Sequence, residues 1–186
     1  MNRIPHRKQR ETFNTPGEPH ELTFTCFKYR KFLHRDRTRW YVIDALSRFP
    51  GQFEFDLWAY VIMPEHVHLI VFPRPDEYDM SAFLKSFKQS VARRAINYLR
   101  RNNPDGLKHL ATGMPNTPYA FWMDGPGYDR NGKKKETLDT MVSYIHNNPV
   151  RRGLVEEPAQ WEWSSAREWQ QPGSGHLRLD LDTYPY

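Results

Sequence analysis

The chain has 186 residues, a length that predicts one domain with an extension and that suffices to bury a sizeable core. Only 38% of the residues are hydrophobic, and no apolar run approaches the roughly 20 residues of a membrane-spanning helix, which excludes a membrane protein. The single cysteine, Cys26, excludes a disulfide framework, and a net charge of +5 with 15% aromatic residues suits single-stranded nucleic acid as well as a merely basic globular protein.

The first segment, residues 1–20, combines basic residues and prolines with few apolar ones, so we expect a flexible basic arm. It lacks the apolar centre of a secretory signal, which predicts a cytoplasmic protein. Residues 21–27 alternate and predict a first strand. In residues 37–49 an apolar residue recurs at every third position, which predicts a helix that Pro50-Gly51 ends.

A predicted β-hairpin follows this helix. Residues 53–63 alternate again, and residues 66–72 form a short apolar run that predicts the partner strand. The alternation places five apolar residues on one face of the first strand: Phe53, Phe55, Leu57, Ala59 and Val61.

Residues 79–101 carry the strongest helix signal, an apolar stripe that Asp79 or Ser81 could cap. Residues 80–103 contain no acidic residue. A solvated helix face normally mixes charges of both signs, so this face is predicted to contact phosphates; a merely soluble basic face is the alternative. The residues concerned are Lys85, Lys88, Arg93, Arg94, Arg100 and Arg101.

The C-terminal third predicts a loop over residues 102–120, a short strand near 120–123 and turns over 124–132. A helix is expected over 136–147, ended by Pro149 because the residue before a proline avoids helical angles. The tail, residues 166–186, is expected to pack on the body. This order of elements predicts the α+β class, a sandwich of an antiparallel sheet and helices.

Two histidines lie two residues apart on the second hairpin strand. Alternation sends His66 and His68 to the same face, roughly 6 to 7 Å apart along the strand, and turns Val67 into the core. Two imidazoles at that spacing can share one metal ion and leave other positions open. Scattered surface histidines are the alternative.

Tyr144 and Asn148 are four residues apart at the end of the last predicted helix and would share one face. A tyrosine hydroxyl becomes a feasible nucleophile towards phosphorus when a metal polarises the phosphate. The amide oxygen of Asn148 suits a hard ion such as Mg²⁺ or Mn²⁺. An ordinary helix tyrosine with an asparagine cap is the alternative.

Residues 127–133 match the first seven positions of a nucleotide phosphate-binding loop, but Lys134 stands where Ser or Thr is required. No buried parallel strand precedes the match, so we reject it and expect Lys133, Lys134 and Lys135 to contact phosphates instead. Trp122 and Tyr128 could stack on bases or pack within the fold.

Read together, the motifs resemble a known family. Residues 60–71, YVIMPEHVHLIV, resemble the signature strand pair of the HUH endonucleases, in which a bulky apolar residue separates two histidines. Residues 144–155, YIHNNPVRRGLV, and the later Trp163-Ser-Ser165 are similar to the tyrosine-helix block of REP-associated tyrosine transposases. Residues 121–130 resemble the block that precedes that helix, so the likeness spans residues 21–165 in the expected order.

The resemblance implies a ferredoxin-like αβ sandwich with helices on one face of the antiparallel sheet. It also implies that Tyr144 attacks single-stranded DNA, forming a 5′-phosphotyrosine link and releasing a 3′-hydroxyl that can later reverse the step. Mg²⁺ or Mn²⁺ would be held by His66, His68 and Asn148. Insertion-sequence relatives have Gln in place of Asn148, so His146 or a water could substitute.

The implied substrate is a palindromic repeat folded as a DNA hairpin. Further phosphate contacts are expected from Arg130, Arg151 and Arg152. The REP-associated group resembles a monomer, and the residues after Ser165 could shield a dimer face, which favours a monomer over a dimer. Two other functions stay open: a hairpin-binding protein that does not cut, and a metal-dependent RNA nuclease of the same fold.

Overall fold

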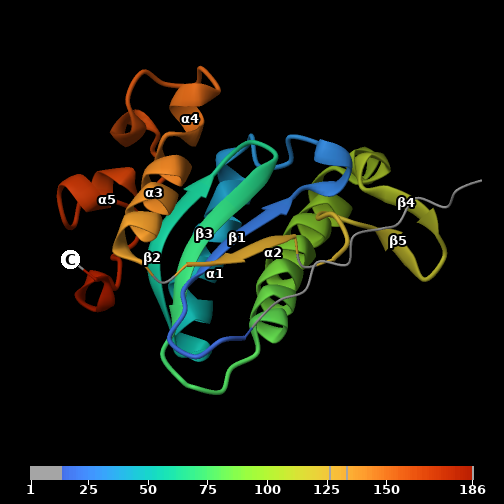
Figure 1. Cartoon of the computed structure of the whole chain (residues 1–186). Helices are drawn as coiled ribbons and strands as arrows, with labels where there is room; N and C mark the ends of the chain where they lie inside the picture. Colours follow the sequence, from blue (N-terminus) through green and yellow to red (C-terminus); the bar gives the residue numbers. More distant parts are fainter. Residues whose placement is uncertain (1–13, 126, 133, 186) are drawn as a thin grey trace, which may run out of the picture.

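The computed structural model describes residues 14–125, 127–132 and 134–185. Four strands form one antiparallel sheet in the order β2-β3-β1-β6, and β4 and β5 form a separate hairpin (Figure 1). The strands are β1 (His20–Thr25), β2 (Phe55–Ile62), β3 (His66–Pro73), β4 (Ala111–Met114), β5 (Thr117–Tyr119) and β6 (Tyr128–Asn131). The α-helices are α1 (Asp36–Gln52), α2 (Met80–Asn102), α3 (Lys135–His146), α4 (Asn148–Arg151) and α5 (Ala166–Gln170). The 3-10 turns are η1 (Phe27–Tyr29), η2 (Pro104–His109), η3 (Pro158–Gln160) and η4 (Leu181–Thr183).

This strand order confirms the α+β sandwich. The long helices α1 and α2 cover one face of the sheet and bury an aromatic-rich core in which Phe24 and Phe87 meet edge to face. Val67 belongs to this core, as the alternation along β3 predicts. Asp79 caps α2 by accepting a hydrogen bond from the Ala82 amide at 2.9 Å.

The opposite face carries a smaller core beneath α3, so helices cover both faces of the sheet and not only one face as expected. Leu138, Met141 and Ile145 of that helix pack against Ile70 of β3 and Trp58 of β2. The α3 face is therefore apolar at Trp58 and Ile70. His66 and His68, at the start of β3, lie on the same face as Ile70 because side chains alternate along a strand.

Strand β2 does not keep one alternation along its length. The register against β3 shifts between Leu57 and Ala59, so Trp58 occupies a bulge. Phe55 and Leu57 face the α1–α2 core, whereas Ala59 and Val61 face α3. The prediction that all five residues share one face is wrong beyond Leu57, because one extra residue exchanges the two faces of a strand.

Two helix boundaries differ from the prediction. Helix α1 continues through Pro50 to Gln52, because a proline in the last turn loses only one intrahelical hydrogen bond. Helix α3 ends at His146, and Pro149 then occupies the first turn of α4, where its fixed φ is suitable.

The region between α2 and α3 differs most from the predicted secondary structure. The predicted loop 102–120 contains η2 and the β4–β5 hairpin, and residues 120–123 contribute only a single bridge, between Trp122 and Cys26. The fourth strand of the sheet is β6, within the segment predicted as turns. Gly127 permits its approach to β1, because a Cβ there would lie 2.1 Å from the Thr23 carbonyl oxygen.

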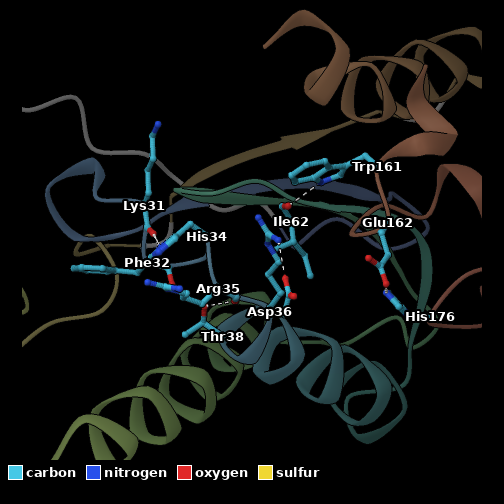
Figure 2. Close-up of polar contacts among 11 residues, drawn as sticks. Lys31, Phe32, His34, Arg35, Asp36, Thr38, Ile62, Trp161, Glu162 and His176 are labelled. Carbon is cyan, nitrogen blue, oxygen red and sulfur yellow. Dashed lines mark hydrogen bonds and ion pairs between the residues drawn. The ribbon is translucent and has the colours of Figure 1, made fainter. Parts of the chain in front are cut away.

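The C-terminal residues cover the free edge of β2. The Ile62 amide donates to the Trp163 carbonyl at 2.8 Å, the Ser165 amide to Tyr60 at 2.9 Å and the Asp180 amide to Leu57 at 3.1 Å. Figure 2 shows the Trp161 indole bonded to the Ile62 carbonyl and the Glu162–His176 pair beside it. These contacts occupy backbone groups through which an edge strand could otherwise pair with another chain. Among the described residues, no helix is long and apolar enough to span a membrane.

Candidate active site

The two histidines of β3 lie together, as the alternation predicts. Their ring centroids are 4.8 Å apart and nearly perpendicular. Each ring is held from behind by a neighbour. Thr23 Oγ1 lies 2.7 Å from His68 Nδ1, and a Glu65 carboxylate oxygen lies 3.3 Å from His66 Nδ1. Partners of this kind fix the orientation of a metal-binding imidazole and leave its Nε2 to face the site.

Tyr144 and Asn148 meet these histidines across the sheet surface. The Tyr144 ring lies edge-on to His68 with centroids 6.1 Å apart, and the Asn148 amide nitrogen lies 2.9 Å from His68 Nε2. Tyr144 is 46% exposed and lines a hollow with His66 and His68. His146 points elsewhere, because its Nε2 is hydrogen-bonded to Ser165 Oγ at 2.8 Å. The structure therefore places Asn148, and not His146, beside His68.

Burial disfavours the charged form of both site imidazoles. It is the main cause that lowers the pKa of His68 to about 3, and repulsion from a protonated His66 and from the positive charge of Arg151 adds to it. Burial also lowers the pKa of His66, against the opposing effect of Glu65. A neutral imidazole offers a lone pair, which is the form that a metal ion binds.

The donor set fits one divalent ion. Two ligands at right angles, each about 2.1 Å from an ion, lie about 3 Å apart, which matches the 2.9 Å between His68 Nε2 and the Asn148 amide. Rotating that amide would present its oxygen instead of its nitrogen. The second carboxylate oxygen of Glu65, next to His66, is buried and has no hydrogen-bond partner within the part of the chain that the structure describes. Among the described residues, no group of three His, Cys, Asp or Glu side chains could hold a metal, so a third protein ligand beside the two histidines would have to be of another type, as Asn148 is.

Two arginines lie close to Tyr144 and to Glu65. The Arg151 guanidinium lies over the Tyr144 ring, 3.9 Å from its centroid. Arg152 pairs with the Glu65 carboxylate at 2.9 Å. Arg151 is the last residue of α4, and Arg152 follows it directly. Positive charge at this place suits a phosphate next to the tyrosine.

Two hollows adjoin at Thr23, His68 and Tyr144. One, of about 510 Å³, also contains His66, Asn148, Arg151 and Arg152; the other, of about 350 Å³, contains Arg130 and Tyr128. The first hollow also contains Tyr29, a residue that sequence reasoning missed. Its only sequence signal was an exposed aromatic within a basic stretch, residues 28–31.

The predicted phosphate contacts divide into two groups. Arg130, Arg151 and Arg152 line the hollows at Tyr144, whereas the basic residues of α2 lie on the helix that covers the other face of the sheet. Lys88 donates to the Met123 and Gly125 carbonyls at 3.1 and 2.7 Å, and Arg94 pairs with Asp44 of α1. Lys85, Arg93, Arg100, Arg101 and Lys134 are exposed.

Two further candidates, Trp122 and Lys135, have other surroundings. Trp122 is buried and donates to the Lys88 carbonyl at 3.0 Å, so it packs within the core and cannot stack on a base. Lys135 pairs with Asp139 at 3.0 Å. Lys133 lies outside the described residues.

The fold and this site define a class: an antiparallel αβ sandwich that presents a helix tyrosine to a histidine pair on its central sheet. The family model described as "Transposase IS200 like" matches residues 22–148. The chain therefore belongs to the IS200-like transposase family, a family of enzymes.

Two relatives agree with this assignment. A Haemophilus influenzae protein described as a candidate REP-associated tyrosine transposase is 24% identical over 138 residues, which cover 70% of this chain and 74% of that protein. A solved structure of a REP-associated tyrosine transposase bound to a REP hairpin has a TM-score of 0.65 and 17% identity, covering 88% of this chain and 86% of that one. This structural likeness supports the ferredoxin-like sandwich predicted from the sequence.

Proposed function

We propose that the chain is a metal-dependent endonuclease and strand transferase for single-stranded DNA, with Tyr144 as its nucleophile. The observation that carries the proposal is the meeting of Tyr144 and Asn148 with His68, some eighty residues earlier in the chain, at an accessible surface. A protein that only binds DNA has no need of this arrangement.

His66, His68 and Asn148 would hold Mg²⁺ or Mn²⁺. When bound, the ion would polarise the scissile phosphate and offset its charge. Thr23 and Glu65 orient the two imidazoles, and burial keeps them unprotonated. The shorter side chain of Asn148 reaches His68 because α4 begins at this residue and brings the backbone close to the sheet.

Tyr144 would form a bond from its Oη to phosphorus as the bond from phosphorus to the 3′ oxygen breaks. The phenol loses a proton and the departing 3′ oxygen gains one, leaving a 5′-phosphotyrosine and a free 3′-hydroxyl. Attack by a 3′-hydroxyl on the phosphotyrosine reverses these changes, so strands are rejoined without ATP. Arg151, over the Tyr144 ring, would stabilise negative charge as it moves between these oxygens.

The substrate we propose is a DNA hairpin formed by a palindromic repeat. The solved relative of similar fold is described as bound to a REP hairpin. The net charge of +5 and the exposed basic residues of α2 would suit the phosphates of a duplex stem. Arg130, Arg151 and Arg152 would contact the single strand, since they line the hollows at Tyr144.

We also propose that a monomer suffices. Tyr144 reaches the histidines of its own chain, and the C-terminal residues already bond to the free edge of β2. Both features remove the need for a second copy to complete the site.

Replacing Tyr144 by Phe tests the nucleophile. Wild-type protein, Mn²⁺ and a labelled hairpin from the repeats of the source genome should give a labelled protein band on a denaturing gel. Tyr144→Phe should bind the hairpin but give no such band, because only the hydroxyl is lost. An adduct in the variant would contradict the assignment. Tight binding without any wild-type adduct would favour the non-cutting binder, and cleavage of the ribose form alone would favour the RNA nuclease.

A further inference from the structure

Two exposed tyrosines flank the nucleophile. Tyr29 is 72% exposed and lines the hollow of His66 and Asn148. Tyr128 is 43% exposed and lines the adjoining hollow with Arg130. Within the part of the chain that the structure describes, neither ring packs against another aromatic ring or a cation. Each hollow therefore pairs one open aromatic face with basic side chains.

Tyr29 is held in an unfavourable backbone conformation. Its φ is +55°, and that of Lys28 is +54°, in the left-handed region that residues other than glycine seldom adopt. Such conformations persist where the surrounding structure imposes them, and they concentrate at functional sites. In this strained backbone conformation, the Tyr29 ring is exposed to solvent at the rim of the site.

The surroundings of η1 fix Tyr29 relative to the histidines. The Phe27 amide donates to the Phe121 carbonyl at 2.9 Å, and the Tyr29 amide donates to Cys26 at 3.0 Å. The Cys26 amide in turn donates to the Glu65 carbonyl at 2.7 Å, and Glu65 orients His66. Two backbone hydrogen bonds thus connect the backbone of Tyr29, through Cys26, to Glu65.

We propose that Tyr29 and Tyr128 are stacking platforms for two bases on opposite sides of the phosphate that Tyr144 attacks. This inference rests on the proposed function. A flat aromatic ring binds any base through its π-face, and nearby arginines can hold the adjoining phosphates. Arg151 and Arg152 serve the Tyr29 side, and Arg130 serves the Tyr128 side. The strand would cross Tyr144 between the two platforms, which positions the scissile phosphate.

The experiment uses the full chain carrying Tyr144→Phe, so that binding is measured without cutting. The probe is a DNA hairpin from the source genome's repeats with its own single-stranded flanks, and 2-aminopurine replaces one flank base at a time. Stacking quenches the fluorescence of this base. We expect quenched fluorescence at one flank position, which Tyr29→Leu restores, and at a different flank position, which Tyr128→Leu restores. Each change should weaken binding of the flanked hairpin about 5- to 100-fold, and Tyr29→Phe should change it less than about 2-fold because the ring remains.

A blunt hairpin without flanks separates stacking from folding. Its affinity should be the same in all variants. Glu54→Gly is the matched control for backbone strain, because Glu54 also has a positive φ, +57°, outside the two hollows. It should leave flank binding and quenching unchanged.

Several results would overturn the inference. One is equal quenching in Tyr29→Leu and its parent. Another is that a tyrosine-to-leucine change weakens binding of the blunt hairpin as much as binding of the flanked hairpin. The third is loss of binding in Tyr29→Phe. In all three the parent chain still binds the hairpin, so the proposed function would stand. A parent chain that binds neither hairpin would contradict the proposed function and the platforms together.

Discussion

The two faces of the sheet are built from the same strands but have different roles. On the α1–α2 face, Val67, Leu69 and Val71 of β3 are fully buried in a continuous apolar core. On the α3 face, alternate residues of the same strand begin with His66 and His68, open to two hollows, and only then become apolar. One face thus supplies a rigid support, and the other carries polar groups that would be costly to bury without partners.

The difference shows how a small domain can hold a polar site in a fixed geometry. Because successive side chains of a strand point to opposite faces, each histidine lies next to a core residue that fixes its backbone. The polar groups then need partners only on their own face. Thr23, Glu65 and Asn148 supply these partners.

The largest expected effect follows from removing a histidine from the open face. His68→Ala should abolish adduct formation and its dependence on added Mg²⁺ or Mn²⁺, since one ligand and the contact to Asn148 are lost together. The measurement is adduct yield across a metal titration, with hairpin binding as the control for folding. Unchanged wild-type activity in a chelator would contradict the metal site.

The neighbouring position on the closed face should behave in the opposite way. Leu69→Ala removes a fully buried side chain and should lower the free energy of unfolding by about 2–5 kcal/mol. Adduct yield per folded molecule should stay within about 2-fold, because Leu69 contacts the α1–α2 core and not the hollows. Urea unfolding measures the change in stability, and the adduct assay measures the activity per folded molecule. A strong loss of activity with unchanged stability would contradict the division between the faces.

A smaller expected effect concerns the pH dependence of stability, which tests a buried histidine of α3 outside the two hollows. His146 is buried against Ser165, and burial lowers its pKa from 6.5 to about 4. Between these values the unfolded chain binds a proton that the folded chain does not, so stability from this group is complete above pH 6.5 and is lost as the pH falls towards 4.

We therefore expect that His146→Gln, which keeps a polar group near Ser165 but cannot titrate, reduces the acid sensitivity of stability. The component removed should be about 3 kcal/mol between pH 7 and pH 4. Urea unfolding of both proteins at pH 7, 5.5 and 4 measures it. Equal pH dependence in the two proteins would show that His146 is not the titrating group.

Much of this molecule follows from local patterns. The alternation in β1 and β3, the apolar stripe of α2 and the Asp79 cap are determined by residues close in sequence, and the structure confirms them. The shared face of His66 and His68 is also a local matter. The tyrosine-helix motif indicated Tyr144, but its distance from the histidines lay beyond any sequence pattern.

Other features depend on contacts between distant segments. The bulge at Trp58 exchanges the faces of β2, and nothing in an alternating sequence marks the place of an extra residue. The short strand β6 has a turn-like composition and exists because β1 offers it an edge. The small hairpin of β4 and β5 is likewise hidden in a segment rich in proline and glycine.

The sequence by itself determined the class of the protein: its main strands and helices, the histidine pair and the tyrosine. Those are set by side-chain periodicity and by motifs. Only the tertiary structure decided that Asn148 and not His146 meets His68, and that Tyr29 stands at the rim of the site. It also decided that the basic helix α2 lies across the sheet from Tyr144. The physical reason is that a site assembles from segments far apart in the chain, and packing sets their positions.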